Sequence, residues 1–222
     1  MRVVAGTARG RKIVAPPGLD VRPTLDRVRQ AIFNALDARA AVEGARVIDL
    51  FAGSGALGIE ALSRGAEHVT FVERDRKSLA CITENLEHLA FTDRATIVRS
   101  DVVAWSAWRI PDADLILIDP PYTFTGWEKL LERVHPALSR PGDRGPDRFG
   151  VAVLETRKSM ALAATWEVVR EQRYGGTVVT FAVPAPSDPF TSTSSSTPES
   201  PALEISDPDP DPDPDPDDLD TE

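Results

Sequence analysis

The 222-residue sequence predicts an α/β fold of the Rossmann-like type, with a mostly parallel seven-stranded sheet and helices on both faces. Strand patterns alternate with segments of helical periodicity between residues 46 and 156, which is typical of right-handed crossovers between parallel strands. A glycine-rich loop at 53–58 follows the first of these strands and opens a helix. The last two strand patterns follow one another around Gly175 and Gly176, so they predict a C-terminal antiparallel pair.

The elements are expected in the following order along the chain. Residues 2–6 and 11–16 predict a short hairpin around the turn at 7–10, and residues 24–40 predict a helix that Thr24 can cap. One face of that helix is apolar and holds Leu25, Val28, Ile32, Phe33 and Leu36. Strands are then predicted at 46–51, 68–73, 95–100, 113–119, 150–156, 165–174 and 176–183, and helices at 56–65, 76–90 and 126–138.

The formal net charge of −10 is distributed unevenly along the chain. Residues 187–222 hold 12 acidic residues and no basic one, and the rest of the chain holds 25 basic and 23 acidic residues. Residues 1–40, which we call the basic head, carry eight Arg or Lys against three acids. Such a basic end is a candidate phosphate-contacting surface, and solvated arginines on a hairpin and a helix face are the simpler explanation.

The segment at 186–222 is predicted to be a disordered acidic tail, because a Ser/Thr run and five consecutive Asp-Pro pairs leave few apolar residues. It could act only as a solubilising tail, or it could fold back onto the basic head and compete with nucleic acid. The Gly/Pro-rich stretch at 139–150 is expected to be a loop insertion.

Composition excludes several classes of site. The single cysteine, Cys81, rules out an internal disulfide and a multi-cysteine zinc site, and it lies within a predicted helix, where it is a poor nucleophile. The three histidines have no metal-ligand spacing, so no metal is expected. No apolar run approaches the ~18 residues of a membrane-spanning helix. No signal-peptide pattern is found at the start, so we expect a cytoplasmic protein.

The first informative motif is the loop in "VIDLFAGSGALGIEAL", where Gly53, Gly55 and Gly58 form a G-x-G-x-x-G pattern. Glycines let the backbone turn sharply and approach a ligand closely, and the pattern alone is also compatible with a dinucleotide. Glu73 ends the next strand about 20 residues later, where ribose hydroxyls would be bound.

Two carboxylates favour S-adenosylmethionine over a dinucleotide. Asp49 directly precedes the glycine loop, where it would oppose a pyrophosphate at the helix N-terminus and match the positive amino and sulfonium groups of S-adenosylmethionine. Asp101 follows the third strand and can accept from an adenine amino group. The simpler alternative for Glu73 and Asp101 is that they are helix N-caps.

The second informative motif is "DADLILIDPPYTF" at 112–124, in which an apolar strand ends in Asp119. Pro120 and Pro121 restrict the backbone and hold Asp119 rigidly at the strand end. Asp119 and the Pro120 carbonyl can together accept from one exocyclic amino group, and Tyr122 can stack on the base. The simpler alternative is that the two prolines only end the strand.

These motifs together resemble a known family. "DPPY" with "DLFAGSG" resembles S-adenosylmethionine-dependent amino-methyltransferases, and "VVAGTARGRKIVAPPGLDVRPTLDRVRQAIFNAL" with "FVERD" and "RYGGT" resembles the RsmD family of 16S ribosomal RNA (guanine-N2)-methyltransferases. The resemblance covers residues 1–183 and implies a class I methyltransferase domain at 41–185, preceded by an RNA-contacting head at 1–40. The acidic tail and the loop at 139–150 depart from the family pattern.

The resemblance also implies roles for particular residues and partners. The substrate would be ribosomal RNA in the small subunit or its assembly intermediate. We expect the protein itself to be a monomer. The implied catalytic residues are Asp119, Pro120, Pro121 and Tyr122, and the implied cofactor residues are Asp49, Phe51, Gly53, Gly55, Glu73, Arg74 and Asp101. We expect RNA contacts from Arg9, Arg11, Lys12, Arg22, Arg27 and Arg29.

Three alternatives share part of this pattern. A DNA or RNA adenine-N6 methyltransferase would use the same Asp-Pro-Pro-Tyr, but the chain is short for a large target-recognition insertion. A non-catalytic RNA-binding assembly factor would be expected to have lost the acids or the Asp-Pro-Pro-Tyr. A nicotinamide-dependent oxidoreductase would use the G-x-G-x-x-G loop alone.

Overall fold

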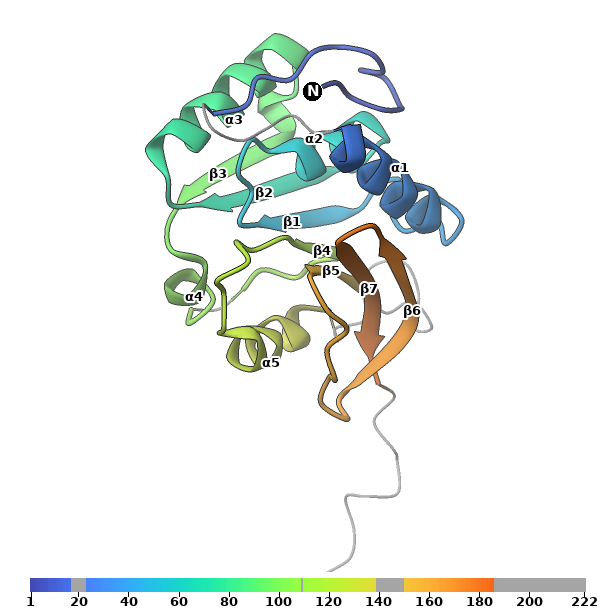
Figure 1. Ribbon diagram of the computed structural model, residues 1–222. Helices are drawn as coiled ribbons and strands as arrows, with labels where there is room; N and C mark the ends of the chain where they lie inside the picture. Colours follow the sequence, from blue (N-terminus) through green and yellow to red (C-terminus); the bar gives the residue numbers. More distant parts are fainter. Residues whose placement is uncertain (17–22, 109, 139–149, 186–222) are drawn as a thin grey trace, which may run out of the picture. The chain divides into compact units, whose positions relative to one another are not determined.

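The computed structural model describes residues 1–16, 23–108, 110–138 and 150–185 (Figure 1). Arg22, the tail at 186–222 and most of the loop at 139–150 therefore lie outside the described residues. The elements of the described part are α1 (Pro23–Asp37), β1 (Arg46–Leu50), α2 (Ala56–Ser63), β2 (His68–Glu73), α3 (Arg76–Leu89), the 3₁₀ turn η1 (Thr92–Arg94), β3 (Ala95–Arg99), α4 (Val102–Trp105), β4 (Leu115–Ile118), α5 (Trp127–Leu138), β5 (Val151–Thr156), β6 (Trp166–Tyr174) and β7 (Thr177–Pro184).

The strands of the described part form one seven-stranded sheet in the order β3-β2-β1-β4-β5-β7-β6. The strands from β3 to β5 run parallel, and β7 pairs antiparallel with both β5 and β6. This confirms the predicted fold. The chain leaves β1 toward β2 on one side and later returns to place β4 on the other side of β1, so the switch point lies between β1 and β4. Ligands of open α/β sheets bind beyond the strand ends at this point.

Each face of the sheet packs against its own helices, as Figure 1 shows. Alternate strand residues such as Val47 and Leu115 pack with α1, α2 and α3, and the intervening residues such as Ile48 and Ile116 pack with α5. Side chains alternate between the two faces of a strand, so the run of four apolar residues in β4 is buried on both sides. None of the helices in the described ranges is long and apolar enough to span a membrane.

The N-terminal segment packs on α2 and differs in detail from the predicted hairpin. One antiparallel bridge joins Arg2 to Lys12, and no longer ladder forms between the two predicted strands. Gly6 lies so close to α2 that a Cβ atom there would be 1.8 Å from the Ser63 carbonyl oxygen. The α1 helix begins at Pro23, and the side chain of Thr24, for which a capping role was predicted, lies outside the described residues.

Candidate active site

A cavity of about 990 Å³ lies at the carboxyl ends of the parallel strands. Each of the five parallel strands brings one carboxylate to its wall, and in strand order from β3 to β5 these are Asp101, Glu73, Asp49, Asp119 and Glu155. Four of the five were predicted as site residues from the sequence. The sheet topology brings them together from positions that span 107 residues of chain, counted from Asp49 to Glu155.

The glycine loop owes its shape to three residues with positive φ, namely Phe51 at 60°, Gly53 at 54° and Gly55 at 78°. The loop leads into α2, whose Gly58 N–H donates to Asp49 Oδ2 at 2.9 Å. Asp49 is 1 % exposed, and this burial raises the pKa of its carboxyl well above the usual range, against the lowering effect of the Gly58 bond. A dinucleotide would place its phosphates at the N-terminus of α2. In this protein an N–H group of that turn already donates to a carboxylate.

Glu73 holds the glycine loop and the start of the next connection together. Its Oε2 accepts from the Gly53 N–H at 2.9 Å, and its Oε1 accepts from the backbone N–H groups of Arg74 at 2.7 Å and Asp75 at 2.9 Å. Asp75, and not Glu73, is the N-cap of α3, where it accepts from the Ser78 N–H. The alternative explanation of Glu73 as a helix cap is therefore wrong.

Asp101 does cap a helix, as the simpler alternative proposed. Its Oδ1 accepts from the N–H groups of Val103 and Ala104 at the start of α4, a short helix that sequence patterns did not predict. Its Oδ2 lies 3.4 Å from Arg74 Nη1. Both Asp101 and Arg74 line the cavity, so the cap also fixes the orientation of a cavity carboxylate.

Asp119 stands one residue beyond β4, next to β1 and β5 in the sheet. The residue is exposed to the cavity, and the protein groups that crowd the carboxylate desolvate it and raise its pKa to about 6. Pro120 is buried, and Pro121 and Tyr122 are exposed. The Arg157 guanidinium carbon lies 3.9 Å from the centroid of the Tyr122 ring, so a cation covers one face of the ring, which remains 63 % exposed.

Three aromatic rings form a packed wall beside this motif. Phe51 meets Phe124 edge to face with 5.0 Å between ring centroids, and Phe124 meets Trp127 in the same way at 5.5 Å. Phe51 and Phe124 line the cavity. The predicted cofactor residue Phe51 thus supplies an apolar surface beside the row of acids.

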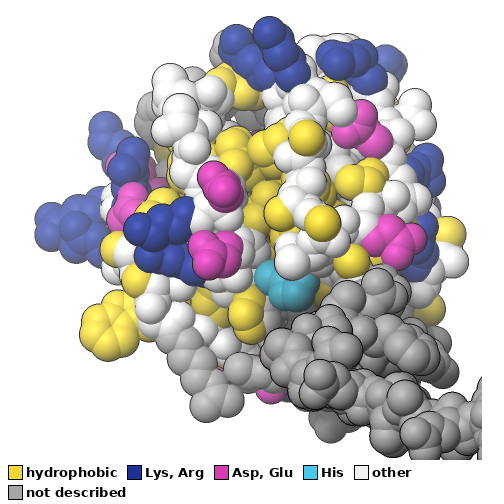
Figure 2. All heavy atoms as spheres, turned by 90° about the horizontal axis from the view of Figure 1, so that it is seen from below, with side chains coloured by type: hydrophobic (Ala, Val, Ile, Leu, Met, Phe, Trp, Pro, Cys, Tyr) yellow, Lys and Arg dark blue, Asp and Glu magenta, His cyan; other side chains and the backbone are white. Residues whose placement is uncertain are grey.

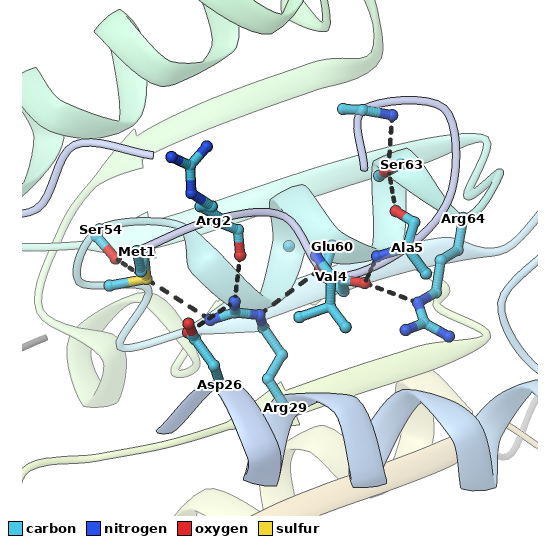
Figure 3. A network of polar contacts seen from close by, with 12 residues as sticks. Met1, Arg2, Val4, Ala5, Asp26, Arg29, Ser54, Glu60, Ser63 and Arg64 are labelled. Carbon is cyan, nitrogen blue, oxygen red and sulfur yellow. Dashed lines mark hydrogen bonds and ion pairs between the residues drawn. The ribbon is translucent and has the colours of Figure 1, made fainter. Parts of the chain in front are cut away.

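Arg29 is a buried arginine that lines the cavity, and Figure 3 shows the groups that it contacts. It is 4 % exposed, donates to the Arg2 carbonyl at 2.6 Å and to Asp26 Oδ1 at 3.0 Å, and its Nε lies 3.6 Å from Glu60 Oε2. A guanidinium held in this way cannot contact a phosphate at the surface. The prediction of an RNA contact by Arg29 was therefore wrong, because an arginine on a helical pattern does not reveal its buried partner.

Glu60 is the centre of the same network and is fully buried. It accepts from the N–H groups of Val4 at 2.8 Å and Ala5 at 2.9 Å, and it pairs with Arg64 Nε at 2.8 Å. The Glu60 carboxylate therefore joins the N-terminal segment, α1 and α2. This network, which we call the Glu60 network, places Met1 and Arg29 at the cavity wall.

The other predicted RNA-contacting residues have different surroundings. Arg9, Lys12 and Arg27 are exposed. Arg11 is also exposed, but its guanidinium donates to the His88 carbonyl of α3. Arg22 lies outside the described residues.

Three residues of the site were not predicted from the sequence. Glu155 and Met1 line the cavity, and Arg157 covers Tyr122. A signal for Glu155 was present, since the fifth predicted strand ends in "LET" just as the fourth ends in "LID". No comparable signal existed for Met1 or Arg157, because tertiary packing alone brings them to the site.

Comparison with known proteins agrees with this geometry. The family model described as "Conserved hypothetical protein 95" matches residues 1–183. Ribosomal RNA small subunit methyltransferase D of Escherichia coli is 38 % identical over 176 residues, covering 79 % of this chain and 85 % of that protein. The Haemophilus influenzae protein of the same name is 30 % identical over 178 residues, covering 79 % and 89 %.

A solved structure shows the same fold. The Escherichia coli protein yhhF superposes with a TM-score of 0.69 at 31 % identity, and the match covers 83 % of this chain and 97 % of that one. The family match, the relatives and the shared fold all span the glycine loop, the row of acids and the Asp-Pro-Pro-Tyr motif. The chain therefore belongs to the family described as Conserved hypothetical protein 95, to which the ribosomal RNA small subunit methyltransferase D proteins also belong.

Proposed function

We propose that this protein transfers a methyl group from S-adenosylmethionine to the exocyclic N2 amino group of a guanine in 16S ribosomal RNA. The observation that carries the proposal is Asp119, a carboxylate that stands between β4 and two prolines in the wall of a cavity that four further acidic residues also line. The names of the relatives support ribosomal RNA of the small subunit as the substrate class.

The side chains of the cavity fit S-adenosylmethionine better than a nicotinamide dinucleotide. Asp49 already accepts from the N-terminus of α2, so a pyrophosphate placed there would meet a buried negative charge. S-adenosylmethionine instead brings an ammonium and a sulfonium group. Asp49 and Asp119 would attract these positive charges, and Glu73 and Asp101 would face the ribose and adenine. Phe51 would pack against the apolar parts of the ligand.

The chemistry divides between the cofactor and the chain. S-adenosylmethionine supplies an electrophilic methyl group. Asp119 and the Pro120 carbonyl accept hydrogen bonds from the two N–H groups of the target amine, which orients its lone pair toward the methyl group. The exposed face of Tyr122 stacks on the base and holds it in this position. Asp119, when ionised, is also the nearest group able to take the proton that the amine loses.

The RNA surface is proposed to include the exposed Arg9, Lys12 and Arg27, together with Arg157 at the cavity mouth. The face seen in Figure 2, on the α5 side, shows Lys and Arg side chains interspersed with acids and hydrophobic groups. This mixed surface is a weaker candidate for phosphate contacts. We further propose that the enzyme acts as a cytoplasmic monomer on the small subunit or its assembly intermediate.

The decisive experiment replaces Asp119 by Ala. Small ribosomal subunits from a strain lacking the gene are incubated with labelled S-adenosylmethionine, and the RNA is digested to nucleosides. The wild-type protein should form N2-methylguanosine, and Asp119→Ala should lose at least about 10³-fold in kcat because the amine loses its charged acceptor. Binding of S-adenosylhomocysteine, measured by calorimetry, should change less than about tenfold.

Asp93→Ala is the matched control, since Asp93 is exposed on η1 away from the cavity. It should leave both turnover and ligand binding unchanged. Formation of N6-methyladenosine in DNA, with no methylated guanosine in RNA, would overturn the proposal in favour of the adenine alternative. Full activity of Asp119→Ala would remove Asp119 from the mechanism.

A further inference from the structure

Among the five carboxylates that line the cavity, only Glu155 has no role in the proposed mechanism. It lies in β5, and the register that pairs Ile118 with Leu154 brings Asp119 and Glu155 to adjacent positions on neighbouring parallel strands. Such strands are ~4.8 Å apart. Glu155 lies two residues after Val153, whose side chain faces α1, and Asp119 lies two residues after the equivalent Leu117. Both carboxylates therefore point to the same side of the sheet and line the same cavity.

The surroundings of Glu155 disfavour the ionised form of its carboxyl group. No hydrogen bond or ion pair joins it to another residue in the described ranges, in contrast to Asp49, Glu73 and Asp101. Burial raises the pKa of Glu155 well above its usual range, the charges of Asp119 and Asp49 raise it further, and Arg29 lowers it. A structural role does not explain this position, since an apolar residue would fill it without the cost of desolvating a charge.

The strand order separates Glu155 from the cofactor side of the site. Asp101, Glu73 and Asp49 stand on β3, β2 and β1, and Asp119 on β4 marks the position of the reacting amine. Glu155 on β5 is the next group beyond Asp119. A base whose amino group is bound by Asp119 would extend its neighbouring ring atoms toward Glu155.

The ring atom next to the amino group differs among the bases. In guanine, N1 carries a hydrogen and lies beside the N2 amino group, so this edge offers a continuous row of donors. In adenine and cytosine, the corresponding ring nitrogen is an acceptor with a lone pair. A carboxylate beside Asp119 accepts a hydrogen bond from guanine N1–H. The same carboxylate repels the lone pair that adenine or cytosine presents at this position.

We propose that Glu155 is a specificity-determining residue that accepts a hydrogen bond from guanine N1–H while Asp119 holds the N2 amino group. This inference rests on the proposed function, because it assigns the base edge that the same site binds. The two carboxylates on β4 and β5, together with the Pro120 carbonyl, form a receptor for the three N–H groups of the guanine edge. Selection of guanine is then a property of the cavity as well as of the RNA surface.

The test compares Glu155→Gln with the wild type on small subunits from the strain lacking the gene. Glutamine keeps the size of the side chain and removes the charge. We expect kcat/KM to fall about 10²- to 10³-fold, as for a site that loses the partner of a substrate N–H, and the affinity for S-adenosylhomocysteine to change less than about threefold. Glu167→Gln, an exposed position on β6 of the same sheet, is the matched control and should retain full activity.

A second arm tests the base edge directly. The target guanine is mapped, and subunits are reconstituted with 2-aminopurine at that position, which keeps the 2-amino group but has an acceptor at N1. The wild type should prefer guanine by about 10²-fold or more, and Glu155→Gln should reduce this preference to about tenfold or less, because its amide can also donate. A circular dichroism spectrum confirms that both variants are folded.

The outcomes separate this inference from the proposed function. If the wild type forms no N2-methylguanosine, the proposed function itself fails. If the wild type forms it and Glu155→Gln keeps its kcat/KM, the assignment of Glu155 is wrong. If kcat/KM falls but the preference for guanine over 2-aminopurine is unchanged, Glu155 acts in another way and the specificity role is likewise overturned.

Discussion

At the scale of single residues, the row of acids in the cavity lowers the stability of the folded protein at neutral pH. Asp119 has a pKa of about 6 in the fold against about 3.8 in the unfolded chain, because protein surrounds its carboxylate. Asp49 and Glu155 are raised in the same direction. Ionising these groups is easier in the unfolded chain, so their charges favour unfolding at neutral pH. Groups placed this way are typical of sites that bind a cation or an N–H edge.

This loss of stability predicts that Asp119→Asn is more stable than the wild type by an amount that depends on pH. Between about pH 4 and pH 6 the folded wild type binds more protons than the unfolded chain, so its stability falls as the pH rises through this range. Asn cannot ionise and avoids this loss. We expect urea unfolding at pH 8 to show Asp119→Asn more stable than the wild type, with the difference shrinking toward pH 4.

The exposed Asp93→Asn serves as the control for this measurement and should follow the wild type at both pH values. An Asp119→Asn variant that is equally or less stable at pH 8 would contradict the raised pKa. The same shift predicts that methyl transfer weakens below about pH 6, where Asp119 becomes protonated and no longer offers a charged acceptor.

At the scale of elements, the glycine loop shows why the third glycine of the motif is needed. Gly58 stands in the first turn of α2, where a Cβ atom would lie 2.3 Å from Phe71 Cε1 and 2.8 Å from Val69 Cγ1. Phe71 is fully buried and cannot move aside. The motif therefore serves the packing of α2 on β2, in addition to the approach of the loop to a ligand.

Gly58→Ala should consequently destabilise the fold by about 1–3 kcal/mol, the usual cost of overpacking a core. Chemical unfolding followed by far-ultraviolet circular dichroism measures the change. Gly176→Ala provides the comparison, since a Cβ atom there meets nothing within 4 Å and φ is not positive. It should shift the free energy of unfolding by less than about 0.5 kcal/mol. Equal effects of the two substitutions would contradict the packing argument.

At the same scale, the Glu60 network links the basic head to α2. Glu60→Gln would remove the charge that compensates the buried Arg29 and Arg64, and it would turn an amide N–H toward the backbone donors of Val4 or Ala5. Breaking a buried ion pair from one side costs about 3–5 kcal/mol. We expect a loss of this size in urea unfolding.

Glu87→Gln tests whether charge alone explains such an effect, because Glu87 is exposed on α3. Its stability should equal that of the wild type. A Glu60→Gln protein of unchanged stability would show that the N-terminal segment is held by other contacts.

At the scale of the whole molecule, the balance of charge predicts the effect of the tail. Removing residues 187–222 takes away 12 acids and leaves 25 basic against 23 acidic residues. The truncated protein should bind small ribosomal subunits more tightly at low salt, and the difference should vanish near 0.5 M salt, where the Debye length is about 4 Å. Filter binding across a salt series measures this.

A full-length protein with the 12 tail acids replaced by Asn and Gln separates charge from bulk. It should bind like the truncated protein if the effect is electrostatic. Unchanged affinity after truncation would leave the tail with a solubilising role only.

The sequence by itself determined the order of the seven strands and the four longer helices, the glycine loop, and four of the five cavity acids, because strand ends and glycine spacings are local patterns. Only the tertiary structure decided which polar groups are already paired: Arg29 with Glu60, Asp101 with α4, Glu73 with the glycine loop. It alone placed Glu155 beside Asp119, 36 residues apart in the chain, because parallel pairing of β4 and β5 sets that register. Local periodicity predicts elements, whereas pairing and burial depend on contacts between distant segments.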